Sequence, residues 1–355
     1  MLSTSVYILA FILSFVVAVV STPLVKKLAI KIGAIDKPNQ RKVHKDIMPR
    51  LGGLAIVFGF FAGLLLINPN YSTIMPFLIG AFIIVVLGIL DDKYTVSPKV
   101  KLFGQIIAAC VVVFSGLKIE MINLPFYGEV HFGIWSYAFT ILWIVGITNA
   151  INLIDGLDGL AAGTSSIALI SILIMAILDG QILVIGLSVI LIGSSLGFLI
   201  FNFYPAKIFM GDTGSLFLGY SISVISIMGL FKNLTLFSFV IPIIILAIPI
   251  FDTVFAIVRR ILKKQKISAP DKSHLHYCLL AMGFSHKTTV LIIYGVSALF
   301  GVSAIIFSAT TLWASVILVL TLLLGIQICA ELIGIIGTKK TPVISLMKRL
   351  MASVK

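Results

Sequence analysis

Four polar side chains in the stretch 149–160 have the types and the spacing to do chemistry. The stretch reads Asn-Ala-Ile-Asn-Leu-Ile-Asp-Gly-Leu-Asp-Gly-Leu, and its amides and carboxylates lie three residues apart, which places neighbours on one face of a helix. Strongly apolar segments flank it, and polar groups beside a bilayer are costly unless they bind something. A polar helix cap and loop between two spans is the alternative. The candidate binding residues are Asn149, Asn152, Asp155 and Asp158.

A pair of adjacent carboxylates, Asp91 and Asp92, closes an apolar run that begins near residue 74. Because neighbouring carboxylates repel, a cation is expected beside them; otherwise the pKa of one of them should rise. Hard oxygen ligands suit Mg²⁺, which usually keeps water and shares phosphate oxygens with its substrate. Lys101 follows closely with two further lysines, and these side chains could hold a phosphate. A solvated helix end with a charged loop is the alternative.

A third motif places Asp212 between Gly211 and Thr213. An acidic residue between a glycine and a hydroxyl residue resembles a phosphate-binding or metal-binding loop at the N-terminus of a helix. Glycine–aspartate turns are common, however, so this motif carries weight only in combination with the other polar motifs.

Two basic loops supply further candidate anion-binding residues. His274 and His276 lie two apart in one loop, where zinc is not expected because no thiolate or third nearby histidine completes a site. Arg41 and His44 lie in the first basic loop, which can reach the same membrane face and cover a phosphate. The alternative for both loops is a topogenic role, because Lys and Arg gather in cytoplasmic loops of membrane proteins.

The composition sets the context in which these residues must be positioned. Of the 355 residues, 60% are hydrophobic and only 11% are charged. A mean hydropathy of +1.19 excludes an ordinary soluble domain. We therefore predict an all-α polytopic integral membrane protein. The net charge of +13 does not indicate a nucleic-acid partner, because the basic residues lie between spans and share no single face.

Apolar runs of about 20 residues can cross a bilayer, or somewhat fewer when polar loops lie at the interface. This criterion predicts about eleven transmembrane helices. They are expected near residues 4–22, 51–67, 74–90, 102–117, 132–148, 160–178, 181–200, 214–231, 237–258, 288–308 and 311–334. The first run lacks a preceding basic residue and is expected to be a retained anchor.

The placement of Lys and Arg predicts the orientation of these helices. With the N-terminus outside and the C-terminus cytoplasmic, only Lys118 and Lys232 among the 26 basic residues fall on the outer side. Most of the acidic residues and histidines then lie on or beside the cytoplasmic face. We expect one integral membrane domain over residues 1–338, with a cytoplasmic active face, and a basic cytoplasmic tail over residues 339–355.

A Mg²⁺ site, anion-holding cations and a membrane position together imply a phosphate substrate that lives in the bilayer. The motifs that carry these groups are Leu90–Asp92, Asn149–Leu160, Met210–Leu216 and Asp271–His276. In this order and on one face, they resemble those of the polyprenyl-phosphate N-acetylhexosamine-1-phosphate transferases, which are glycosyltransferase family 4 enzymes. This resemblance implies transfer of a sugar 1-phosphate from a UDP-sugar to a polyprenyl phosphate, with release of UMP and a requirement for Mg²⁺, for which Mn²⁺ is a substitute.

The resemblance also implies roles for individual residues. Asp91 and Asp92 match the essential aspartate pair and are the expected catalytic residues, whereas Asn152 and Asp212 match the metal ligands. The other positions are expected to bind substrate: Asp155 and Asp158 line the nucleotide pocket, Lys101 contacts phosphate, and His274 and His276 belong to the loop that closes on the sugar diphosphate. Asn149, Arg41 and His44 complete the expected substrate-binding set. The family's histidine motif often has a third histidine, and Tyr277 stands there in this chain.

The spacing of His274 and His276 favours the bacterial branch that uses UDP-N-acetylglucosamine and undecaprenyl phosphate, at the plasma (inner) membrane, to start teichoic acids, O-antigens and related polymers. The phospho-N-acetylmuramoyl-pentapeptide transferases of peptidoglycan synthesis, where the two histidines are usually adjacent, are the near alternative. A membrane prenyltransferase would leave the Asp212 loop and the histidine loop unexplained. A transporter would need ionisable groups near mid-membrane. The sequence leaves the oligomeric state open, a homodimer included.

Overall fold

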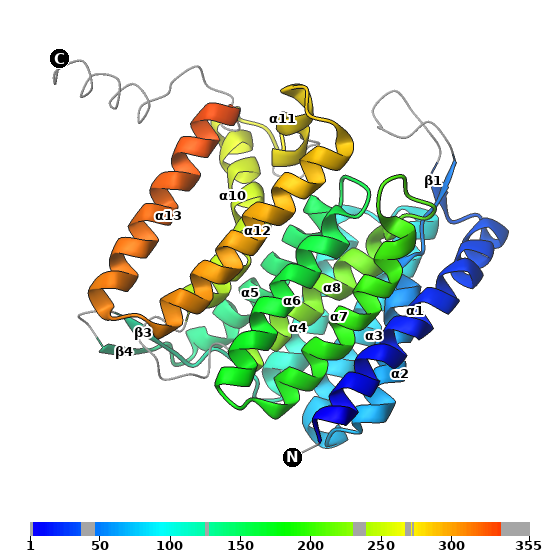
Figure 1. Ribbon diagram of the computed structural model, residues 1–355, viewed down its shortest axis with the longest axis horizontal. Coiled ribbons are helices and arrows are strands. Elements are labelled where there is room, and N and C mark those ends of the chain that lie inside the picture. Colours follow the sequence, from blue (N-terminus) through cyan, green and yellow to red (C-terminus); the bar gives the residue numbers. More distant parts are fainter. Residues whose placement is uncertain are drawn as a thin grey trace.

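The computed structural model in Figure 1 describes residues 3–36, 47–124, 128–229, 239–266, 271 and 273–334. Two of the expected substrate-binding residues, Arg41 and His44, lie outside the described residues. The expected cytoplasmic tail over residues 339–355 lies outside them as well.

The described residues form a helical bundle with two short hairpins (Figure 1). The first hairpin pairs β1 (Ile35–Asp36) with β2 (Met48–Pro49), and the second pairs β3 (Met121–Leu124) with β4 (Gly128–His131). The helices are α1 (Thr4–Ile32), α2 (Gly53–Ile67), α3 (Tyr71–Tyr94), α4 (Pro98–Phe114), α5 (Trp135–Ile154), α6 (Leu160–Leu178), α7 (Ile182–Asn202), α8 (Gly211–Gly229), α9 (Val240–Ile245), α10 (Ala247–Leu262), α11 (Leu275–Ala281), α12 (His286–Ala309) and α13 (Leu312–Ile333).

Each apolar run singled out in the sequence overlaps a described helix, so the prediction of a mostly helical membrane protein is confirmed, apart from the two hairpins. The run at 237–258 differs from the prediction because it is divided into α9 and α10 at Leu246. Pro249 explains the break: it has no N–H to donate to the carbonyl of Ile245, and its ring would clash with that carbonyl in a continuous helix. Helix α10 then continues to Leu262, past the predicted end of the span at residue 258.

Seven of the described helices, namely α1, α3, α5, α6, α7, α12 and α13, are long and apolar enough to cross a membrane. This agrees with a polytopic membrane protein, while the count of eleven spans and the orientation of the termini stay predictions. Helix α2 is shorter: its 15 residues span about 22 Å, less than the hydrocarbon core of about 30 Å.

Helix α8 is the centre of the bundle, and nearly all of its residues are buried. It packs against α2, α3, α5 and α6, whereas α12 and α13 lie toward the side of the bundle opposite α1 (Figure 1). Only 6% of the residues in the most apolar window of α13 are buried, so that helix is the most exposed of the candidate spans. The first turn of this central helix carries Asp212, one of the predicted site residues.

The predicted orientation can be tested by cysteine labelling in intact cells, with the native cysteines replaced. Cysteines introduced at the exposed positions Lys99, Lys207 and Lys266 should react only after the membrane is permeabilised to a charged maleimide, because basic loops stay in the cytoplasm. A cysteine at the exposed Glu120, beside the second hairpin, is the matched outer position and should react without permeabilisation. Labelling of any of the three inner positions in intact cells would overturn the orientation.

Candidate active site

The predicted aspartates of α3 and α8 meet where the end of one helix adjoins the start of the other. Asp92, in the last turn of α3, accepts a hydrogen bond through Oδ1 from the backbone N–H of Asp212 at 2.8 Å. Its Oδ2 accepts from the backbone N–H of Thr213 at 3.0 Å and from the Thr213 hydroxyl at 2.7 Å. The Asp92 carboxylate thus caps the N-terminus of α8, where backbone donors are unpaired and negative charge is favoured.

The first turn of α8 can approach α3 only because both backbones lack side chains at the crossing. A Cβ on Gly88 would lie 2.4 Å from the Cα of Thr213. Gly211 has a φ of +70°, and a Cβ there would lie 2.5 Å from Oδ2 of Asp92. Glycine is therefore required at both positions for the Asp92 cap to form.

Two cations join the carboxylates of this cluster. The Lys101 ammonium, from the first turn of α4, lies 2.5 Å from Oδ2 of Asp91 and also forms an ion pair with Asp212. Arg50 follows the first hairpin, and its guanidinium nitrogens lie 3.7 Å from Asp92 Oδ1 and 3.8 Å from Asp212 Oδ1. Burial lowers the pKa of Arg50, but the carboxylates of Asp92, Asp212 and others raise it by more, so the guanidinium stays charged.

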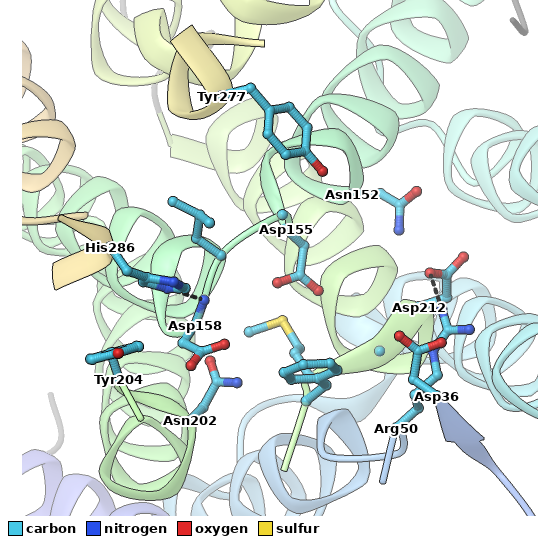
Figure 2. Close-up of a pocket in the computed structure, with 15 residues that line it drawn as sticks. Asp36, Arg50, Asn152, Asp155, Asp158, Asn202, Tyr204, Asp212, Tyr277 and His286 are labelled. Carbon is cyan, nitrogen blue, oxygen red and sulfur yellow. Dashed lines mark hydrogen bonds and ion pairs between the residues drawn. The ribbon is translucent and has the colours of Figure 1, made fainter. Parts of the chain in front are cut away.

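A pocket of about 430 Å³ opens beside this cluster (Figure 2). Asp212 and Arg50 lie at one side of it, and Asp155 and Tyr277 point into it from the other helices (Figure 2). Its polar lining residues are Asp36, Arg50, Asn152, Asp155, Asp158, Asn202, Tyr204, Asp212, Tyr277 and His286. Four of the predicted site residues, Asn152, Asp155, Asp158 and Asp212, therefore line one pocket with residues from distant parts of the chain.

The loop between α5 and α6 forms one wall of the pocket. Asp158 accepts a hydrogen bond through Oδ2 from the Ala206 N–H at 2.9 Å, and its own N–H donates to Nε2 of His286 at 3.0 Å. The N–H of Gly159 donates to Oδ1 of Asn202 at 3.1 Å. The helix ends at Ile154, so Asp155 and Asp158 lie in the loop that follows and not on the helical face of the two amides. Gly159 is the N-cap of α6 and adopts a φ of +78°, which favours glycine.

The two amides of the stretch have different surroundings. Asn152 donates a hydrogen bond from Nδ2 to the Ser215 hydroxyl at 2.8 Å, and its side chain lines the pocket. Asn149 instead donates to Oε1 of the buried Gln105 at 2.6 Å and to the carbonyl of Val145 at 2.8 Å, between α4 and α5. Asn149 does not line the pocket, and its contacts are those of a helix-packing residue.

The two histidines predicted to bind substrate lie behind the pocket wall. His274 lies with Nδ1 2.8 Å from Oδ2 of Asp252, and neither His274 nor His276 lines the pocket. His276 is 1% exposed, and among the described residues neither of its ring nitrogens has a hydrogen-bond partner. Burial lowers the pKa of His276 to about 4, so its ring is neutral. Tyr277, at the place of the third histidine, is the residue of this loop that reaches the pocket.

Several pocket residues were not predicted from the sequence. Arg50 belongs to the first basic loop, which was expected to reach this face and cover a phosphate, and His286 could have been chosen because it is one of only five histidines. His286 stacks on Tyr204 with ring centroids 4.6 Å apart, and this pair borders the side of the pocket near Asp158. Tyr204 and Asn202 had no signal in the sequence, since they lie in an apolar segment without a recognisable motif.

The residues present fit a magnesium ion that shares its ligands with substrate. Burial and, after it, the nearby charges of Asp212 and Asp92 together raise the pKa of Asp155 to about 8, which indicates an excess of negative charge beside the pocket. Asp212 and Asn152 both face the pocket with hard oxygen donors. Among the described residues, no group of three or more His, Cys, Asp or Glu side chains could hold a metal alone. A Mg²⁺ ion here would therefore need phosphate oxygens and water to complete its shell.

Comparison with known proteins now decides the family. The chain is 55% identical, over 97% of both chains, to the probable undecaprenyl-phosphate N-acetylglucosaminyl 1-phosphate transferase of Bacillus subtilis. The family model of glycosyl transferase family 4 matches residues 74–230. The chain belongs to glycosyltransferase family 4.

More distant relatives cover most of the chain as well. The decaprenyl-phosphate N-acetylglucosaminephosphotransferase of Mycolicibacterium smegmatis is 36% identical over 81% of this chain and 79% of its own. The undecaprenyl-phosphate alpha-N-acetylglucosaminyl 1-phosphate transferase of Yersinia pestis is 28% identical over 85% of this chain and 82% of its own. Asp91, Asp92 and Asp212 lie inside the segment matched by the family model, whereas Arg50 and the histidine loop lie outside it.

The crossing of α3 and α8 can be tested with two glycine substitutions in helices. Gly88→Ala should destabilise the protein by about 1–3 kcal/mol, because the added methyl group overlaps the Thr213 backbone and pushes α8 away from Asp92. Gly146→Ala, on the exposed side of α5 with nothing within 4 Å of the added Cβ, should leave stability unchanged or raise it by about 0.5–1 kcal/mol. Thermal unfolding in detergent measures both. Equal midpoints for Gly88→Ala and wild type would contradict the close crossing.

Proposed function

We propose that this protein transfers N-acetylglucosamine 1-phosphate from UDP-N-acetylglucosamine to undecaprenyl phosphate and releases UMP. The proposal places this reaction at the cytoplasmic face of the bacterial plasma (inner) membrane, as the initiating step of a cell-envelope polysaccharide. The observation that carries it is the pocket lined by Asp212, Asn152 and Arg50, with Lys101 paired to Asp212 beside it. The names of the relatives supply the donor and the acceptor.

The site chemistry supports phosphoryl transfer, in which positioning and charge neutralisation do most of the work. An oxygen of the lipid phosphate attacks the sugar-side phosphorus of the diphosphate, and the bond from that phosphorus to the oxygen of UMP breaks. When bound between Asp212 and Asn152, Mg²⁺ supplies charge neutralisation to the diphosphate. Lys101 and Arg50 already hold positive charge at this place and can contact the phosphate oxygens.

The two aspartates of the α3 motif have contacts that suit different roles. Both oxygens of Asp92 are engaged by the start of α8, and its side chain is fully buried, so it fits a positioning role. Asp91 is 7% exposed; its Oδ2 pairs with Lys101, and its Oδ1 accepts a hydrogen bond from the Val96 N–H at 2.5 Å. In the proposal, Asp91 accepts or orients the proton of the attacking lipid phosphate. Both residues were expected to be catalytic from the sequence, and their roles stay predictions.

The rival enzyme and transport functions find less support among the described residues. Asp91, Asp155 and Asp212 all lie at helix ends, whereas a transporter would need such groups near mid-membrane. A membrane prenyltransferase would leave the pairing of Lys101 with Asp212 without a role. The pocket favours a donor with a diphosphate over either alternative.

Donor choice is tested with purified protein in lipid nanodiscs that contain undecaprenyl phosphate. Radiolabelled UMP should exchange into UDP-N-acetylglucosamine, and UDP-N-acetylmuramoyl-pentapeptide should turn over at least about a hundredfold more slowly, a difference of about 2.7 kcal/mol in transition-state binding. Protein with Asp212→Asn is the control for contaminating activity. Faster turnover of the pentapeptide donor would move the function to peptidoglycan synthesis, and no exchange with either donor would reject the proposal.

The metal assignment is tested by comparing Asp212→Asn with Asp91→Asn. Asp212→Asn should weaken Mg²⁺-dependent binding of UDP-N-acetylglucosamine and reduce turnover about a hundredfold or more, because a ligand charge is lost. Asp91→Asn should instead lower kcat about a hundredfold while donor binding keeps its Mg²⁺ dependence, because its role is in the transition state. Calorimetric titration with and without Mg²⁺ separates the two. Unchanged Mg²⁺ dependence in Asp212→Asn would move the metal to the α3 pair.

A further inference from the structure

A buried carboxylate outside the cluster, Asp252, lies in α10 and does not line the pocket described above. It stands within the helix, between apolar neighbours, and is 4% exposed. An isolated buried carboxylate is strongly destabilising, so its partners must be held closely. It also lies outside the segment matched by the family model.

Both oxygens of Asp252 bind the same short segment. Oδ2 lies 2.8 Å from Nδ1 of His274, and Oδ1 accepts a hydrogen bond from the Leu275 N–H at 2.7 Å. His274 is the N-cap residue of α11 but makes no side-chain cap of its own. Asp252 therefore does two things from a neighbouring helix: it orients the His274 ring and satisfies a backbone donor at the start of α11.

A second tether from α10 holds the chain just before α11. Asp271 accepts hydrogen bonds through Oδ2 from Nε of Arg259 at 3.0 Å and from Nη2 at 2.5 Å, and through Oδ1 from the Ser273 N–H at 2.9 Å. Burial raises the pKa of Asp271, but the Arg259 bonds lower it by more, so the pair is ionised. Arg259 was expected to be a topogenic loop residue, yet it is 2% exposed. The Asp252–His274 and Arg259–Asp271 contacts thus hold the chain segment before α11 against α10.

From this anchored end, α11 reaches the pocket through its first turn. The rings of His274 and His276 are nearly parallel, 4° apart, with centroids separated by 5.9 Å. His276 packs on the wall formed by the α5–α6 loop, since a Cβ on Gly156 would lie 2.3 Å from its Nε2. The neighbouring Tyr277 ring lies 4.2 Å from that of His276 and lines the pocket. The position of Tyr277 therefore depends on where Asp252 holds the start of α11.

We propose that Asp252 is a positioning residue for donor binding: it holds α11 so that Tyr277 closes one side of the sugar-diphosphate pocket, with His276 packed against Tyr277 and Gly156. This inference rests on the proposed function for its substrate. Among the described residues, neither buried ring nitrogen of His276 has a hydrogen-bond partner, so packing and the tether at His274, and not bonds of its own, hold this ring in place. Asp252 itself touches neither substrate nor metal; it acts through α11.

The first test measures the position of α11 without any enzyme activity. Cys278 lies on α11 and is half-buried, so its reaction with a maleimide reports whether the helix stays docked, once Cys110 and Cys329 are replaced. Asp252→Leu should raise the labelling rate of Cys278 by about tenfold, because local opening of α11 becomes easier. Thr253→Val is the matched control on the same helix, since the Thr253 hydroxyl is buried without a hydrogen-bond partner. Equal rates for Asp252→Leu and Thr253→Val would overturn the inference.

The second test separates positioning from general destabilisation by kinetics. Asp252→Asn keeps the size of the side chain and an oxygen that can accept the hydrogen bond from the Leu275 N–H. It should raise KM for UDP-N-acetylglucosamine about tenfold, with less effect on kcat or on KM for the lipid phosphate. The double variant with His276→Ala should be no worse than the more impaired single variant, because both changes act through one contact surface. Multiplicative effects, or an equal rise in both KM values, would overturn the inference. An inactive wild type would instead reject the proposed function and leave the labelling result to decide the docking of α11.

Discussion

A carboxylate at the N-terminus of a buried helix holds the active face of this protein together. Helix α8 runs through the centre of the bundle, so the N–H groups at its start cannot be satisfied by bulk water. Asp92 satisfies two of them from the end of α3, and the partial positive charge of the helix end offsets part of the cost of burying the carboxylate. The same contact places Asp212 beside Asp91 and Lys101, so the geometry of the site depends on the packing of α3 against α8.

The close backbone crossing around α8 follows from this constraint. Gly88 lets α3 approach Thr213, and on the other side a Cβ on Gly53 would lie 2.0 Å from the Gly214 nitrogen. Small residues at helix crossings are the usual means of packing where lipid removes the hydrophobic drive for helix association. The starts of α2 and α8 and the end of α3 therefore meet at one place. The charged residues lie at these helix ends because burying an unpaired charge further along a span is costly.

The carboxylate cluster and α11 are held in place in different ways. The carboxylate cluster lies on helix ends fixed by the bundle core, whereas α11 is a seven-residue helix held by buried contacts with α10. A short helix has little stability of its own, so its place is decided by such contacts. Tyr277 can thereby border the pocket, with His276 packed beside it, while the carboxylate cluster keeps its own contacts.

The sequence by itself determined the helices and named Asp91, Asp92, Asp155 and Asp212, because apolar runs and polar motifs are local signals. The described residues bear out the helices, and they bring Asp212 and Asp155 to one pocket. Only the tertiary structure decided that Asp92 caps α8, that Asn149 packs on Gln105, and that Asp252 holds His274. Arg50 and His286 joined the pocket in the same way. Each of these contacts joins residues of different helices or loops, and hydrophobic periodicity and motif spacing report only on neighbours along the chain.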